Sequence, residues 1–390
     1  MIHPDEALRL IAALDIAVLP DEPRGIPLKY ALGRVLARVL PAAVDQPPFD
    51  KSAMDGFAWG GESRPAYAVV GTIAAGFVPS LRLMEGECAR IMTGAPLPPG
   101  AERVQRVEWT AEEGGFVRFT KAESSDNVIR RGENQKTGDV LLDRRVLRPA
   151  DIGILASSGY ASVPVQRRPV VGVVSTGNEL RAAGEPLDPG AIFDSNGPQL
   201  AAQARAYGCE IMAYGRFPDC KEALGGIVRR GLGECDLLLI SGGVSMGDYD
   251  LVPEVLERNG VTKLFHNLAM KPGKPTYLGR KGDVIVLGLP GNPVSTFVNF
   301  EILGKAVLAR LRGLPAEAPA VRVRLAEALG GGSLDRVEYL PARIRNGEIR
   351  PLRYTGSSML SALSEANALI RLEIGQTRLE IGAEIDARPV

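Results

Sequence analysis

Histidine is the residue that this sequence most clearly lacks. Only His3 and His266 occur among 390 residues. This scarcity argues against a histidine-based zinc site and against Ser-His-Asp catalysis. Any chemistry must therefore be done by carboxylates, lysines, hydroxyls, backbone amides or a hard metal ion.

Cysteine pairs, net charge and long apolar runs are also missing. Lys plus Arg equal Asp plus Glu, 46 each, so no broad basic surface for nucleic acid is expected and any anion site must be local. No apolar run reaches the ~20 residues that cross a bilayer, and the N-terminal segment carries acids where a signal peptide is basic. We expect a cytoplasmic protein that binds neither nucleic acid nor membrane.

The cysteines have no Cys-x-x-Cys spacing and are predicted to be buried or partly buried reduced thiols: Cys88, Cys209, Cys220 and Cys235.

The apolar pattern of the first 168 residues predicts two domains. An amphipathic helix over 4–18 and a short helix over 30–39 belong to a discontinuous base domain, residues 1–44 and 127–168. Between its two parts, short alternating runs broken by Gly and Pro predict a β-rich domain of about six strands over 45–126.

From Val170 the period changes. Continuous apolar strands alternate with helices, which predicts a doubly wound, mostly parallel α/β domain over 169–314, with Asn196 and Asp219 capping two of its helices. Short strands return over 315–390 and predict a small β-barrel domain. The predicted fold class is therefore multidomain α/β plus β, with the α/β domain flanked by β-rich domains.

Four small-residue turns follow strands or open helices in the α/β segment: STGNEL, DSNGPQL, SGGVSMGDYD and LPGNPVS. In a doubly wound sheet the carboxyl ends of the strands meet at one crevice, where backbone amides can bind phosphate. None of the four matches the P-loop or dinucleotide fingerprint, so the pattern predicts a different phosphate or nucleotide site. Its expected binding residues are Ser241, Gly242, Gly243, Ser245, Pro290, Gly291, Asn292, Pro293 and Ser295.

Charged residues near these turns suggest what the crevice binds. Lys271 and Lys274 flank a rigid Pro-Gly pair and could hold a tetrahedral oxyanion, although a solvated basic turn has the same pattern. Likewise, Asp219 alone could be only a helix cap, and Asp55 only a turn residue. Four acids could hold Mg²⁺ together with substrate phosphates: Glu179, Asp219, Asp248 and Asp250.

These stretches, with KPGKP, FDKSAMDGFA and RIMTGAPLP, resemble the signature sequences of the molybdopterin molybdenumtransferases, the MoeA family, which includes the E domain of gephyrin. The likeness runs from about residue 5 to the C-terminus, whereas MogA-type adenylyltransferases would share only 168–313. The resemblance implies insertion of molybdate into adenylylated molybdopterin, with Mg²⁺-dependent release of AMP. It also implies a homodimer with a shared active cleft, and a MogA-type adenylyltransferase and client molybdoenzymes as partners.

The resemblance also assigns roles to single residues. Functional positions fall on Asp55, Thr93, Glu179, Asp219, Asp250 and Lys271, with Asp219 and Asp250 serving Mg²⁺ and the nucleotide end. The oxyanion pocket would be lined by Lys274, Arg343 and Ser357. Asn134 and Asn267 depart from the family pattern, because each stands where many members carry a charge. These departures leave one alternative open, a weakened paralogue that stores or delivers the cofactor. The likeness to gephyrin leaves another, an interaction scaffold.

Overall fold

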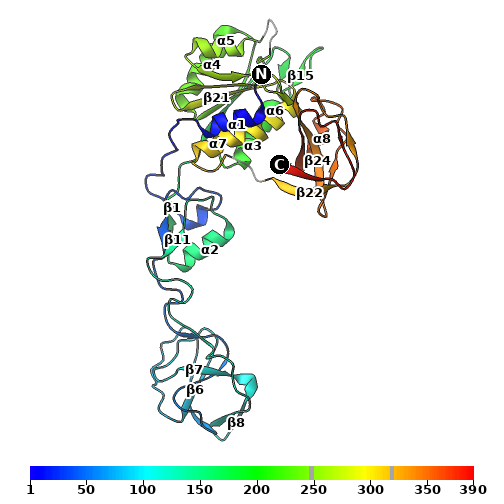
Figure 1. Ribbon diagram of the computed structural model, residues 1–390. Coiled ribbons are helices and arrows are strands. Elements are labelled where there is room, and N and C mark those ends of the chain that lie inside the picture. The colour runs from blue at the N-terminus through cyan, green and yellow to red at the C-terminus, as the bar shows by residue number, and fades with distance from the viewer. Residues whose placement is uncertain (246–249, 317–319) are drawn as a thin grey trace. The chain divides into compact units, whose positions relative to one another are not determined.

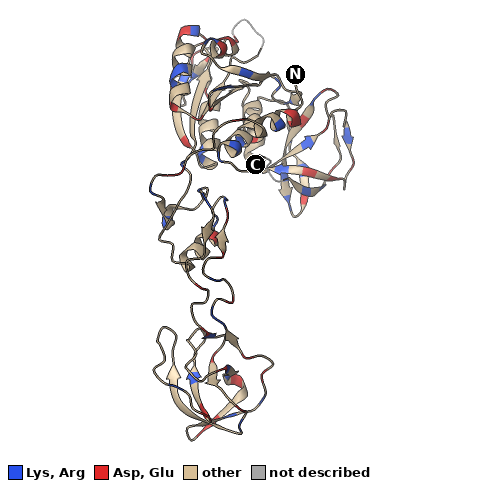
Figure 2. Ribbon diagram, turned by 60° about the vertical axis from the view of Figure 1, so that its left-hand side comes forward, with Lys and Arg blue, Asp and Glu red and all other residues tan. Residues whose placement is uncertain are grey.

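The computed structural model describes residues 1–245, 250–316 and 320–390, and these divide into two compact units (Figure 1). One unit comprises residues 1–21 and 166–390, and the other residues 22–165. Figure 2 shows acidic and basic residues interspersed along the ribbon of both units. Within the described ranges, no helix is both long and apolar enough to span a membrane.

The larger unit is built on a six-stranded sheet. Its first four strands run parallel and its last two are joined by antiparallel pairings, so that only the fifth strand runs against the others and the predicted mostly parallel sheet is confirmed. The spatial order is β16 (Glu210–Phe217), β13 (Val170–Thr176), β17 (Leu237–Ser241), β21 (Val284–Leu289), β20 (Tyr277–Lys281) and β18 (Thr262–His266).

Helices cover both faces of this sheet, because alternate side chains of each strand point to opposite sides. In β17, Leu237 and Leu239 join one apolar core, whereas Leu238 and Ile240 join another. The second core packs against α4 (Lys221–Glu234) and α5 (Val252–Arg258). The first packs against α1 (Pro4–Ala12), α3 (Asn196–Ala206), α6 (Pro293–Asn299), the π-helical turn η3 (Phe300–Gly304) and α7 (Lys305–Leu311).

The first helix is shorter than its periodicity predicts, since α1 ends at Ala12. Leu14 and Ile16 are still buried, but in irregular backbone. The Arg310 guanidinium donates to the carbonyl oxygens of Leu14 (2.6 Å) and Ile16 (3.0 Å), so the chain there is tied to α7 instead of to its own preceding turn. The predicted short helix over 30–39 is also wrong: only the 3₁₀ turn η1 (Leu28–Tyr30) forms nearby.

Both predicted helix caps in the α/β domain are wrong as well. Asn196 is the first residue of α3, and Ser195 precedes it as the cap residue. Cys220, not Asp219, precedes α4. The side chains of Asn196 and Asp219 are engaged elsewhere, in contacts that belong to the candidate site.

A small closed barrel follows the α/β domain, as predicted. Five strands close on themselves because β24 pairs with both β25 and β26. They are β22 (Val321–Leu325), β24 (Val337–Arg345), β25 (Glu348–Pro351), β26 (Ala368–Leu372) and β28 (Glu384–Pro389). The short helix α8 (Ser361–Glu365) and the pair β23 (Leu329–Gly330) and β27 (Arg378–Leu379) complete this part. Two residues of the α/β domain, β19 (Met270–Lys271), add a parallel strand beside β24.

The smaller unit has a six-stranded sheet in the predicted β-rich segment. Three aromatic side chains of this segment, Trp59, Tyr67 and Phe119, contact one another in tilted and stacked pairs. Its order is β7 (Arg103–Arg106), β4 (Gly56–Trp59), β6 (Glu87–Ile91), β5 (Tyr67–Ile73), β9 (Phe116–Phe119) and β8 (Thr110–Glu113). Shorter elements are β1 (Ile26–Pro27), β2 (Leu40–Pro41), β3 (Lys51–Ser52), η2 (Val107–Trp109), β10 (Val128–Ile129), β11 (Val140–Leu142), α2 (Pro149–Ser157) and β12 (Ser162–Val163). The four cysteines of the chain are free, three of them buried and Cys220 half-buried.

Candidate active site

Three strands of the parallel sheet, β13, β17 and β21, end at one edge and open into the turns that the sequence singles out. Close approach of these turns demands glycine. Gly242 has φ +96°, and a Cβ there would lie 2.3 Å from the carbonyl oxygen of Thr176. Gly243 also has a positive φ. Small residues therefore bring the backbone of neighbouring strand ends together at this edge.

The acids of the candidate site meet in a small cavity at this edge, which we call the carboxylate pocket. It has a volume of about 240 Å³ and contains Glu179, Asp219 and Asp250. Asp219 is held in place because its Oδ1 accepts a 2.6 Å hydrogen bond from the Thr176 hydroxyl. Asp248, the fourth predicted acid, lies outside the described residues. The other lining residues are Thr176, Gly177, Gly242, Gly243, Val244, Ser245, Pro275, Pro290 and Gly291.

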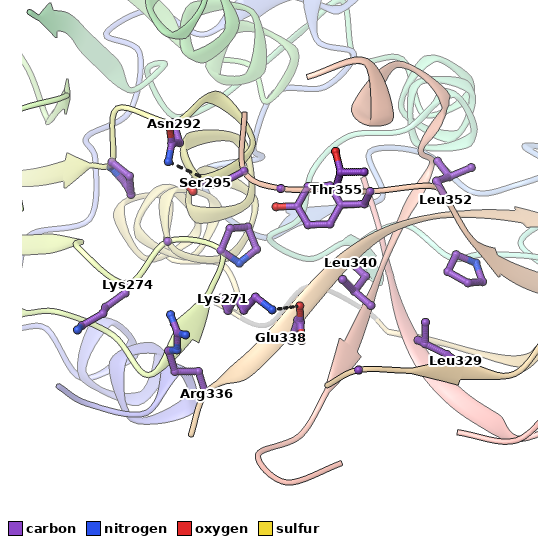
Figure 3. A pocket seen from close by; sticks show the side chains of 18 of the residues that line it. Lys271, Lys274, Asn292, Ser295, Leu329, Arg336, Glu338, Leu340, Leu352 and Thr355 are labelled. Carbon is purple, nitrogen blue, oxygen red and sulfur yellow. Dashed lines mark hydrogen bonds and ion pairs between the residues drawn. The ribbon is translucent and has the colours of Figure 1, made fainter. Parts of the chain in front are cut away.

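The lysines line a second, larger cavity of about 620 Å³, which we call the lysine pocket (Figure 3). It is lined by the KPGKP segment, by the start of α6 and by residues of the barrel domain. Figure 3 shows Arg336 on the same side of the cavity as Lys271 and Lys274. The predicted residues found here are Lys271, Lys274, Pro290, Asn292, Ser295 and Ser357.

A buried carboxylate holds one of these lysines. The parallel pairing of β19 with β24 places Lys271 directly opposite Glu338, and the Lys271 Nζ lies 2.9 Å from Glu338 Oε1 (Figure 3). The Glu338 side chain is only 6% exposed, whereas that of Lys271 is 44% exposed. The pKa of Tyr354, in the same cavity, is raised to about 12. Burial of the Tyr354 hydroxyl is the larger cause, and the negative charge of Glu338 is the second. Glu338 thus fixes the position of the Lys271 ammonium on the cavity wall.

The KPGKP turn is held from behind by a buried amide. Gly273 has φ +108°, and a Cβ there would lie 2.0 Å from Asn299 Nδ2. The Thr276 hydroxyl lies 2.7 Å from the carbonyl oxygen of Gly273 and 2.8 Å from Asn299 Oδ1. Asn299 Nδ2 in turn donates to the carbonyl oxygen of Ser295. The lysine turn and helix α6 are therefore joined in one hydrogen-bonded network.

Sequence reasoning misplaced one lysine-pocket residue and missed three. Arg343 is not among the residues that line this cavity: its guanidinium donates to the Glu365 carbonyl oxygen and lies 3.5 Å from the Glu365 carboxylate. Arg336, Glu338 and Tyr354 line it instead. The available signal was an acidic residue, Glu338, in the otherwise apolar first half of β24.

Ser241 ends β17 and lines a third cavity at the same edge, and Pro293 begins α6 and lines none of the cavities described here. Asp55 and Thr93 lie in the smaller unit and are brought together by the pairing of β4 with β6. Asp55 Oδ1 accepts hydrogen bonds from the Thr93 backbone N–H (2.6 Å) and the Thr93 hydroxyl (2.9 Å). The backbone bond, followed by the hydroxyl bond, lowers the pKa of Asp55. Both side chains are exposed, so the pair presents an ionised carboxylate to solvent.

The two departures from the family pattern occupy exposed or strained backbone. Asn267 has φ +73°, a left-handed conformation that asparagine tolerates better than lysine or arginine. Asn134 is exposed, and its backbone N–H donates to the Gln46 carbonyl oxygen. Neither lines one of the cavities described here.

Known proteins resemble this chain over almost its whole length. Family models match at residues 2–159 (MoeA N-terminal region, domain I and II), 172–310 (probable molybdopterin binding domain) and 322–390 (MoeA C-terminal region, domain IV). A molybdopterin molybdenumtransferase of Bacillus subtilis (strain 168) is 33% identical over 98% of this chain and 93% of its own length. Another from Staphylococcus aureus (strain N315) is 31% identical over 93% of this chain and 90% of its own.

Solved structures agree. The molybdopterin biosynthesis moeA protein from Pyrococcus horikoshii OT3 superposes with a TM-score of 0.86 over all of both chains, at 28% identity. The matched regions, the near-complete relatives and the fold together identify the chain. It belongs to the MoeA family of molybdopterin molybdenumtransferases, which are transferases of molybdenum cofactor biosynthesis.

Proposed function

We propose that this transferase binds adenylylated molybdopterin and molybdate in one cleft, cleaves the pyrophosphate bond, releases AMP and leaves molybdenum on the dithiolene. The observation that supports this proposal is the order of cavities along the strand ends. Pro275 and Pro290 line the lysine pocket, the carboxylate pocket and a third cavity of about 370 Å³. The cleft therefore has a cationic end for an oxyanion and a carboxylate end for a metal-bound phosphate.

The lysine pocket is the proposed molybdate subsite. The ammonium groups of Lys271 and Lys274 and the guanidinium of Arg336 supply fixed positive charge, and the Ser357 hydroxyl adds a neutral donor. Each charge-assisted contact to an oxyanion is worth about 1.5–3 kcal/mol. Because Glu338 already orients Lys271, little reorganisation is needed when the anion binds. The protein's contribution is thus mainly positioning and electrostatics.

The carboxylate pocket is the proposed magnesium subsite. Carboxylate oxygens are hard ligands of the kind that Mg²⁺ prefers, and Asp219 and Asp250, with Glu179 nearby, would hold it. The described residues contain no group of three acidic, histidine or cysteine ligands that is complete by itself, so substrate phosphates and water would fill the coordination shell. Bound there, Mg²⁺ would neutralise developing charge on the pyrophosphate. The Thr176 hydroxyl fixes Asp219 through Oδ1 for this task.

Further proposals concern assembly and location. We infer that the protein is a cytoplasmic homodimer, and that Asp55 and Thr93 of one protomer serve the cleft of its partner, as the family resemblance implies. Its substrate must come from an enzyme that adenylylates molybdopterin, and its product must pass to enzymes that use molybdenum. The weakened-paralogue alternative is not favoured, because the relatives that match nearly the whole chain are named as transferases.

Complementation tests the proposed function. A bacterial strain without its own molybdenumtransferase should recover molybdoenzyme activity when it expresses this protein at low external molybdate. A Lys274→Ala variant should need about tenfold more molybdate, whereas Lys263→Ala, which removes an exposed lysine of β18, should behave as wild type. Failure of the well-expressed wild type to complement at any molybdate concentration would refute the proposal.

A further inference from the structure

Two buried polar side chains lie behind the lysine turn, residues 271–275. Thr276 and Asn299 are both 0% exposed, and neither lines one of the cavities described here. Burying a hydroxyl and an amide costs free energy that apolar side chains of similar size would not cost. The neighbours of Asn299 on the chain, Val298 and Phe300, belong to the apolar core. The polar pair in this core therefore calls for an explanation that packing does not give.

The Asn299 amide packs directly against the backbone of the lysine turn. A Cβ on Gly273 would lie 2.0 Å from Asn299 Nδ2, so only glycine lets the turn approach this closely. The same Nδ2 donates a 2.8 Å hydrogen bond to the carbonyl oxygen of Ser295. Because that carbonyl oxygen can only accept, the amide is oriented with its Oδ1 toward the Thr276 hydroxyl, 2.8 Å away. The amide is thus held from helix α6 and presents its oxygen to the turn.

The Thr276 hydroxyl completes this network on the side of the turn. It lies 2.7 Å from the carbonyl oxygen of Gly273, so two acceptors share its hydrogen. At the other end of the network, Ser295 lies in the first turns of α6 and lines the lysine pocket. Thr276 and Asn299 therefore set the spacing between the lysine turn and α6, two elements that line the same cavity.

The two lysines of the turn depend on this network to different degrees. Lys271 is held by its own ion pair with Glu338 (Figure 3). Lys274 is exposed, and its ammonium takes part in none of the ion pairs or side-chain hydrogen bonds of the described residues. Its backbone carbonyl oxygen accepts from the backbone N–H of Thr276 (2.9 Å). The position of Lys274 is thus set by the backbone of the turn, which Thr276 and Asn299 hold.

We propose that Thr276 and Asn299 are positioning residues for the molybdate subsite. They touch no substrate, and they hold the turn so that the Lys274 ammonium lies where the oxyanion binds. A donor that is already in place binds an anion without the cost of ordering a mobile turn. This inference rests on the proposed function, because it explains how one lysine of the same subsite is preorganised.

A comparison of serine with alanine at position 276 tests the inference, since the two variants differ only in the hydroxyl. Thr276→Ala should raise the molybdate concentration for half-maximal single-turnover AMP release about three- to tenfold. It should lower the rate at saturating molybdate much less. Thr276→Ser should keep the molybdate dependence of the wild type. Val307→Ala, which leaves a small cavity in the same apolar core, should lower the melting temperature without changing the molybdate dependence.

A double-mutant cycle identifies the lysine through which Thr276 acts. Adding Thr276→Ala to Lys274→Ala should have little further effect on the molybdate requirement, because the ammonium that the turn positions is already absent. Adding it to the Lys271→Met, Glu338→Leu variant should raise the requirement by the same factor as in the wild type, because Lys274 is still present.

Three results would overturn the inference. They are the same molybdate dependence in the serine and alanine variants, an equal effect of Thr276→Ala with and without Lys274, and a shift in Val307→Ala as large as that in Thr276→Ala. In each case the wild type still needs molybdate to release AMP, so the proposed function survives. AMP release by the wild type that does not depend on molybdate would instead contradict both.

Discussion

The buried ion pair between Lys271 and Glu338 makes the most discriminating prediction. The two charges lie 2.9 Å apart, but their surroundings differ, because the Glu338 side chain is 6% and the Lys271 side chain 44% exposed. Lys271→Met removes the cation and leaves a buried carboxylate without its partner. Breaking a fully buried pair costs about 3–5 kcal/mol. Since Lys271 is nearly half exposed, solvent screening reduces the expected loss to roughly 1–3 kcal/mol.

A double substitution separates stability from function. Glu338→Leu added to Lys271→Met replaces the pair with apolar groups and should restore most of the lost stability, because the unpaired buried charge is gone. Molybdate dependence should not recover, since the ammonium that binds the oxyanion is still absent. We expect an at least tenfold higher molybdate requirement in both variants. Thermal unfolding and molybdate titration of AMP release provide the two measurements.

An exposed pair provides the control. Lys263 and Glu257 are also 2.9 Å apart, but both are about half exposed, so Lys263→Met should cost at most about 1 kcal/mol. If the double variant regains normal molybdate dependence, Lys271 is only a structural partner of Glu338. If Lys271→Met is no less stable than Lys263→Met, the reasoning from burial is wrong.

Four other predictions follow from the same contacts. Asp219→Asn should slow pyrophosphate cleavage more than it weakens AMP binding. It should barely lower the melting temperature, because Asp219 is not the cap of α4. Single-turnover AMP release measures the first effect and thermal unfolding the second. A heterodimer of one Asp55→Ala subunit and one Lys271→Ala subunit should regain about half the activity of a wild-type dimer, because one of its two clefts is intact, and a monomer at micromolar concentration in sedimentation would exclude a shared cleft. Asn267→Lys should lower the melting temperature and leave insertion activity no higher, because its φ is +73°. The pKa of Asp45 is lowered to about 2, first of all by the hydrogen bond from the Thr137 backbone N–H. Because its pKa is lower in the folded protein, the Asp45 carboxylate stabilises the fold above about pH 4, and this contribution disappears as the pH falls toward 2. Asp45→Asn should therefore remove that part of the acid-unfolding profile.

Local patterns predicted most of the architecture, because each domain has its own apolar period. The parallel strands are continuous apolar runs, and Asn292 followed by Pro293 marked the start of α6 correctly. The helix predicted over 4–18 is too long, because a distant arginine, Arg310, donates hydrogen bonds to the carbonyl oxygens of Leu14 and Ile16. The apolar periodicity of a segment carries no information on hydrogen bonds to residues far along the chain.

The candidate site was partly predictable for a similar reason. Glycine and lysine turns are short-range signals, and the structure gathers most of them along one cleft. Glu338 was missed because it lies 67 residues from Lys271, by subtraction of their sequence numbers, and meets it only through the two-residue strand β19. Asn196 was read as a helix cap because asparagine is common there, whereas its amide bonds Ser241 and Gly291.

The central claim is that one cleft couples molybdate binding to cleavage of the pyrophosphate bond. The most direct measurement is single-turnover AMP release from adenylylated molybdopterin by the purified protein with Mg²⁺, with and without molybdate. We expect release that depends on molybdate and falls at least tenfold in Lys274→Ala at limiting molybdate. AMP release at the same rate without molybdate, or in Lys274→Ala at every molybdate concentration, would contradict the claim.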